Sequence, residues 1–130
     1  QSPWAYRFVT EVIGERLPYY AYEDIDKECS TGRERKYRKL LLRISNFVYP
    51  ARLEQIDIHD DDESLSTAIE NAGVNGAVVI EGINADEAAK ASWERIKDDE
   101  RIGVTFDLYD VGICFLDREI YKQHYKLNFF

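Results

Sequence analysis

Three carboxylates at the ends of expected strands are the strongest candidates for chemistry in this sequence. Glu81 follows the apolar run 76–80. Asp107 and Asp110 lie in and just after the alternating segment 104–108. If those two strands are neighbours, the carboxylates meet at one edge of a sheet, where Mg²⁺ or Mn²⁺ would find the oxygen ligands it prefers. This pattern indicates a divalent-metal-dependent phosphoesterase or nuclease.

The same carboxylates have a purely structural explanation. With 25 acidic residues among 130, adjacent carboxylates are common, and they cap helices, end strands and solvate the surface. His59 and His124 have no second histidine or cysteine at a metal-ligand spacing. The chain has no phosphate-binding loop, dinucleotide fingerprint, nucleophile elbow or zinc signature. We therefore leave catalysis undecided and favour a non-catalytic domain.

A basic segment at residues 33–43 interrupts the otherwise acidic chain. It contains Arg33, Arg35 and Arg38, and its apolar positions recur at helical spacing, which predicts an amphipathic helix. Arginine beside an aromatic residue can bind phosphate or an acidic partner. The alternatives are a solvated helix face and pairing with the chain's own acidic run 60–63, which itself suits a helix N-terminus.

Aromatic residues form a second candidate surface. Tyr19, Tyr20 and Tyr22 lie so close in sequence that not all of them can face a core, and exposed tyrosine is typical of protein interfaces. The chain ends in Phe129 and Phe130, an apolar end that a partner would cover. An oligomer could form through this C-terminal strand.

The elements that must position these residues follow from hydrophobic periodicity. A loop is expected at 25–35, and Asn84 with Glu87 resembles a capping box. The helices are expected near 3–13, 36–48, 65–72 and 84–97, and the strands near 19–22, 52–59, 76–80, 104–108, 113–116 and 121–130. This order predicts an α+β fold with a single mixed or antiparallel sheet, three to four helices packed on it, and a C-terminal three-stranded β-meander.

Composition sets the remaining bounds. The 130 residues, 45% of them hydrophobic, predict one domain spanning 1–130. The net charge of -8 opposes binding of nucleic acid by the surface as a whole and binding to anionic membranes. No apolar run approaches the roughly 20 residues that span a bilayer, so we expect a soluble protein. Cys29 and Cys114 are expected to be free thiols, as in a reducing compartment. Because the chain begins at Gln1 and lacks Met, we interpret it as a processed chain or a piece of a longer one.

These observations favour an interaction or regulatory domain that binds a protein partner and needs no cofactor. The expected partner-binding residues are Tyr19, Tyr20, Tyr22, Arg33, Arg35, Arg38, Phe129 and Phe130. The first alternative is a Mg²⁺- or Mn²⁺-dependent enzyme that uses Glu81, Asp107 and Asp110. The second alternative is a structural component of a larger assembly.

Overall fold

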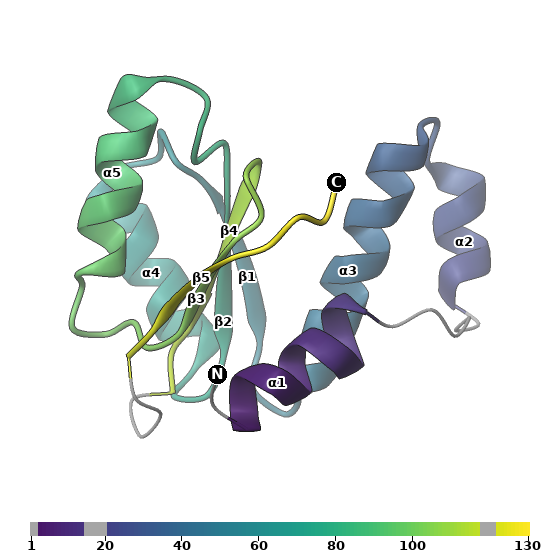
Figure 1. Cartoon of the computed structure of the whole chain (residues 1–130), viewed down its shortest axis with the longest axis horizontal. Helices are drawn as coiled ribbons and strands as arrows, with labels where there is room; N and C mark the ends of the chain where they lie inside the picture. The colour runs from purple at the N-terminus through teal and green to yellow at the C-terminus, as the bar shows by residue number, and fades with distance from the viewer. Residues whose placement is uncertain (1–2, 15–20, 118–121) are drawn as a thin grey trace. The chain divides into compact units, whose positions relative to one another are not determined.

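A computed structural model describes residues 3–14, 21–117 and 122–130 of the chain (Figure 1). The backbone divides into two compact units. The helical unit comprises residues 1–47 together with Phe130, and the sheet unit comprises residues 48–129. The single domain expected from the sequence stays a prediction.

The helical unit begins where the sequence predicts a helix. It contains α1 (Pro3–Phe8), the π-helical turn η1 (Val9–Ile13), α2 (Ala21–Glu28) and α3 (Gly32–Val48). Aromatic rings join α1 to α3, because Phe47 lies with its ring centroid 5.7 Å from that of Trp4 and 5.3 Å from that of Phe8. The apolar residues that recur at helical spacing in the first helix therefore pack into the core of this unit.

The segment from 21 to 35 differs from the expected strand and loop. Ala21 and Tyr22 begin α2, and α3 already starts at Gly32. Tyr19 and Tyr20 lie outside the described residues. Thr31 explains the early start of α3, because its hydroxyl accepts a hydrogen bond from the Glu34 N–H (3.1 Å) and so caps the helix. The expected loop was therefore wrong for most of its length.

The sheet unit contains one mixed five-stranded sheet. Its strands are β1 (Leu53–Asp57), β2 (Ala77–Glu81), β3 (Thr105–Asp107), β4 (Val111–Phe115) and β5 (His124–Lys126). The spatial order is β1-β2-β4-β3-β5. The β1–β2 and β3–β5 pairs are parallel, whereas β4 runs antiparallel to both of its neighbours. This arrangement confirms the expected α+β class with a mixed sheet.

The expected C-terminal meander was wrong. In a meander the last strand would pair antiparallel with the strand before it, but β4 is already flanked by β2 and β3. The final strand therefore reaches the open edge of β3, and it pairs there in parallel over His124–Lys126. The described residues contain five α-helices, where three to four were expected.

Two helices of the sheet unit, α4 (Asp62–Ala72) and α5 (Glu87–Lys97), lie on the same side of the sheet (Figure 1). The N-cap of α5 is Asp86, whose carboxylate accepts from the Ala89 N–H, and the expected cap at Asn84 was wrong. The helices and strands share one apolar core that includes Leu65, Ala68, Val78, Ile80, Ala89, Trp93 and Cys114. This core holds the ends of β1, α4 and α5 in place around the site described next.

Candidate functional site

The connection between β1 and α4, residues 57–63, gathers five carboxylates and is here called the acidic loop. The Asp60 N–H donates to the carbonyl of Asp57, and the Asp57 N–H donates back to the Asp60 carboxylate, both at 3.0 Å. Asp61 caps α4 by accepting from the N–H and the hydroxyl of Ser64, each at 2.8 Å, and these bonds lower the pKa of Asp61. The side chains of Asp62 and Glu63 make no hydrogen bond or ion pair with any described residue.

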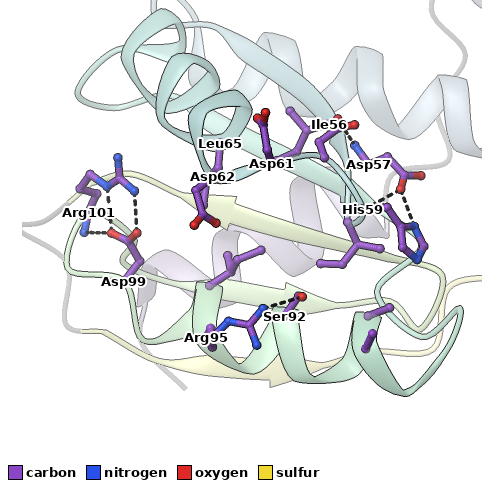
Figure 2. A pocket seen from close by; sticks show the side chains of 15 residues that line it. Ile56, Asp57, His59, Asp61, Asp62, Leu65, Ser92, Arg95, Asp99 and Arg101 are labelled. Atoms are coloured by element: carbon purple, nitrogen blue, oxygen red, sulfur yellow. Dashed lines mark hydrogen bonds and ion pairs between the residues drawn. The ribbon is translucent and has the colours of Figure 1, made fainter.

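A groove of about 540 Å³, here called the inner groove, separates the acidic loop from α5. Its apolar lining includes Ile56, Leu65 and Ile96. Figure 2 shows Asp62 and Arg95 approaching this space from opposite sides. Arg95 donates to the Ser92 hydroxyl at 2.8 Å. The inner groove thus combines an apolar lining with both signs of charge.

One end of the inner groove is closed by His59. Its Nδ1 lies 2.8 Å from the Asp57 carboxylate, and its Nε2 lies 3.0 Å from the Asp86 carboxylate (the Asp57 bond is drawn in Figure 2). The carboxylates of Asp86 and Asp57 raise the pKa of His59. The pKa of Asp86 is lowered chiefly by the Ala89 N–H and then by His59, and that of Asp57 by the backbone and then the ring of His59. His59 therefore links the acidic loop to the start of α5.

The other end of the inner groove is closed by Arg101. Its guanidinium binds both carboxylate oxygens of Asp99, at 3.0 and 2.7 Å, and donates to the Ser66 hydroxyl of α4 at 3.0 Å (Figure 2 shows the Asp99 pair). Arg101 holds the pKa of Asp99 below its ordinary value. Both ends of the groove are thus pinned by ion pairs.

A second groove of about 460 Å³, here called the outer groove, lies along β1 on the other side of the acidic loop. Four carboxylates line it, from Glu54, Asp60, Asp61 and Glu63. Apart from Ile56, its remaining lining is polar or small, and no Lys, Arg or His belongs to it. None of the four carboxylates forms an ion pair with a described residue. The outer groove is therefore strongly anionic.

The carboxylates expected to hold a metal come to the same end of the sheet. Glu81 is paired with Val111, and Asp107 with Gly112, so Glu81 and Asp107 point to opposite faces of the sheet. The Asp107 carboxylate accepts from the Tyr109 N–H at 2.8 Å. Across the described residues no group of three or more His, Cys, Asp or Glu side chains is arranged to hold a metal. The fold thus separates Glu81 from Asp107 by the thickness of the sheet.

The basic segment of α3 is engaged within the helical unit. Arg38 pairs with Glu28 at 2.8 Å, and Arg35 donates to the Cys29 carbonyl at 2.9 Å. Tyr22 is buried, and its hydroxyl accepts from Arg43 at 2.9 Å. These contacts give the expected partner-binding residues of α2 and α3 a role in holding the two helices together.

The aromatic C-terminus is split between the two units. Phe129 is buried, whereas Phe130 is 39% exposed. The Arg33 guanidinium lies 4.8 Å from the Phe130 ring centroid, and the Tyr37 ring centroid lies 6.2 Å from it. The terminal ring therefore packs on the first turns of α3.

Burial leaves Cys114 without the surroundings of an activated nucleophile, whereas the Arg38 guanidinium donates to the Cys29 Sγ at 3.6 Å. Cys29 and Cys114 are both free and buried, and burial raises the pKa of the Cys114 thiol. His124 lies 2.7 Å from the Thr105 hydroxyl, and burial lowers its pKa. Free thiols were expected, and this is confirmed.

Sequence reasoning treated the acidic run as the start of a helix or as an ion-pair partner of the basic segment, and it missed the grooves on either side of the run. Its position directly after an edge strand is the signal that could have drawn attention to it. Comparison with protein-family models, curated proteins and solved structures finds no match. Among the described helices, none is both long and apolar enough to cross a bilayer.

Proposed function

We propose that this chain is an interaction domain whose acidic loop binds a positively charged region of a partner protein. The observation that carries the proposal is the uneven distribution of charge. Residues 48–129 contain 18 Asp and Glu but 8 Lys and Arg, a net charge of -10. Residues 1–47 contain 7 acidic and 9 basic residues, a net charge of +2. The net negative charge of the chain therefore comes entirely from the sheet unit.

The local chemistry of the loop supports binding of cations. The side chains of Glu54, Asp62 and Glu63 make no ion pair or hydrogen bond with the described residues. Unpaired carboxylates around a concave surface concentrate negative potential there, which raises the association rate of a basic partner and disfavours acidic ones. His59 and Arg101 hold the surrounding elements in place, so the loop meets a partner in a preorganised shape.

The test measures binding of a fluorescent peptide rich in lysine and arginine by fluorescence polarisation. We expect binding that weakens as NaCl is raised, since screening shortens the reach of exposed charges. The triple variant Asp60→Asn, Asp62→Asn and Glu63→Gln should weaken binding about tenfold and flatten the salt dependence. Asp61 is left unchanged because it caps α4.

The matched control removes three exposed carboxylates elsewhere in the same unit, in the variant Glu70→Gln, Glu94→Gln and Glu100→Gln. It changes the net charge by the same amount without touching either groove. We expect it to bind the peptide nearly as well as the wild-type protein. Equal losses in the two triple variants would mean that the peptide responds to diffuse charge, and the acidic loop would not be the site.

A further inference from the structure

The outer edge of β1 carries backbone groups that its neighbour β2 does not use. β1 is the terminal strand in the sheet order. The Arg52 carbonyl accepts from the Ala77 N–H, and the Ile58 N–H donates to the Glu81 carbonyl. Residues of even number therefore bond to β2, and the N–H and carbonyl groups of the odd-numbered residues in β1 point away from the sheet.

Only part of this edge is open. The backbone groups of Asp57 are occupied by Asp60, which accepts from its N–H and donates to its carbonyl. Leu53 and Gln55 have no partner for their outward groups within the described residues, and Gln55 is exposed. Four backbone hydrogen-bonding groups are thus available for one additional short strand.

The outer groove lies beside this open edge. Glu54 and Ile56 of β1 line it, together with Asp60 and Glu63. Side chains of a strand alternate between the two faces of a sheet. A strand added beside β1 would therefore place every second side chain in the outer groove, among four carboxylates and no cation.

We propose that the β1 edge accepts an extended segment of a partner protein as a sixth strand, with Lys or Arg at every second position seated in the outer groove. Main-chain hydrogen bonds supply affinity in such strand addition, and alternate side-chain pockets supply specificity. The inference rests on the proposed function and names the partner's conformation and sequence pattern.

A second copy of this chain fits the edge less well. Pairing of two β1 edges would bring the carboxylates of two outer grooves together, and like charges at an interface oppose association. The opposite edge, β5, has basic residues nearby, but the Lys122 ammonium donates to the carbonyls of Asp99 and Ile102. His124 is likewise engaged with Thr105. Among the described residues this leaves Lys126 as the one exposed cation of β5, against four carboxylates in the outer groove. The unpaired carboxylates therefore match cations from another protein.

The experiment compares three synthetic peptides of identical composition by fluorescence polarisation. The first alternates lysine or arginine with threonine, the second has its basic residues in one block, and the third is the alternating peptide with a backbone N-methyl group on every residue. We expect the alternating peptide to bind about tenfold more tightly than the other two, because it alone combines the pattern with free N–H groups. Equal binding of all three would overturn the proposal.

A variant of the protein tests the same edge from the other side. Gln55→Pro removes an outward N–H, a change that edge strands tolerate because the bonds to the inner neighbour remain. Gln55→Thr keeps the N–H and is the matched control. We expect Gln55→Pro to lose most binding of the alternating peptide and Gln55→Thr to keep it. If circular dichroism shows that Gln55→Pro does not fold, the proposal is tested by comparing how tightly the alternating and N-methylated peptides bind the wild-type protein.

The outcomes separate this inference from the proposed function. Suppose that the acidic-loop triple variant loses peptide binding, that Gln55→Pro binds as well as Gln55→Thr, and that the N-methylated peptide binds as well as the alternating peptide. The acidic loop then remains the site and strand addition is wrong. If the alternating peptide does not bind at all, both proposals are wrong.

Sedimentation of concentrated protein adds one more check. A mass that rises with concentration in the wild type but not in Gln55→Pro would identify a second copy as the occupant and overturn the proposal.

Discussion

The two units of this chain treat their charged residues differently. In the helical unit, cations of α3 pair with carboxylates of α2, Arg38 with Glu28 at 2.8 Å and Lys39 with Asp26 at 2.6 Å. In the sheet unit, Asp62 and Glu63 of the acidic loop have no partner in the described part. A basic run that looks like a binding surface in sequence is thus largely satisfied locally. In an acidic run that looks like a helix start, Asp61 does cap the helix, but Asp62 and Glu63 are left without side-chain partners in the described part.

The interiors of the two units also differ in how polar they are. The core of the sheet unit is a large apolar cluster between the sheet and two helices. The helical unit buries Arg43, whose guanidinium donates to the Val12 carbonyl at 2.7 Å and to the Tyr22 hydroxyl at 2.9 Å. We therefore expect the sheet unit to respond most strongly to changes of volume and the helical unit to changes of hydrogen bonding.

The largest effect is expected from Gly112→Ala in the sheet unit. Gly112 lies in the central strand β4, and a Cβ there would overlap three ring atoms of Trp93, a buried residue of α5. Overpacking of this kind should lower the free energy of unfolding by about 3 kcal/mol. Chemical denaturation measures the loss. Labelling of the buried Cys114 thiol under native conditions should accelerate, whereas that of Cys29 in the helical unit should change less.

The control for Gly112→Ala is the double variant with Trp93→Phe. A smaller ring makes room for the added methyl group, so the two losses should not add. Trp93→Phe also removes the buried indole N–H, which has no partner in the described structure. Strictly additive losses would show that Gly112 is required for a reason other than its contact with Trp93.

Much of the fold was predictable because it depends on local patterns. The apolar run of β2 and the helical spacing in α4 and α5 identify their elements directly. Sheet order was not predictable, since nothing in the β5 sequence indicates that β4 is already flanked on both sides. The start of α3 could have been found, because Thr31 and Glu34 have the spacing of a capping box.

The candidate site was less predictable than the fold. Glu81 and Asp107 lie at one end of the sheet, but β4 separates their strands, which were expected to be neighbours. The register that sends the two side chains to opposite faces depends on pairing between distant strands. The grooves beside the acidic loop depend on how α4 and α5 pack, which no local spacing of residues encodes. Arg35 and Arg38 were chosen for their charge, whereas Glu28 at the end of α2 binds Arg38 and the next residue, Cys29, binds Arg35. The sequence pattern had suggested a loop for this segment.

A smaller effect is expected from Tyr22→Phe in the helical unit. The substitution keeps the ring but leaves a buried Arg43 N–H without its acceptor. The free energy of unfolding should fall by about 2 kcal/mol, the range for a hydrogen bond to a charged group. Because Tyr22 packs with Cys29 in a small apolar cluster, labelling of the Cys29 thiol should accelerate.

Tyr37→Phe is the matched control for Tyr22→Phe, since Tyr37 is a tyrosine of the same unit that is only partly buried. Its loss should be clearly smaller. If Tyr22→Phe accelerates labelling of Cys114 as much as that of Cys29, the two units do not respond separately, and the contrast between them fails.

The smallest effect concerns pH and compares two histidines within the sheet unit. The carboxylates of Asp86 and Asp57 raise the pKa of His59, whereas burial lowers that of His124. NMR titration of the imidazole protons should therefore give a pKa above the ordinary 6.5 for His59 and below it for His124. Midpoints on the same side of 6.5 would contradict the two environments.

The same shifts determine how stability depends on pH. Because the folded-state pKa of His59 is raised, its contribution is complete below 6.5 and is lost as pH rises through the folded value. The pKa values of Asp57 and Asp86 are lowered, so their contribution is present above 3.8 and is lost as pH falls through the folded values. The advantage of wild type over His59→Asn in melting temperature should thus be largest between pH 3.8 and 6.5. For His124→Asn the trend should reverse, because protonation of a partly buried imidazole costs stability as pH falls below 6.5.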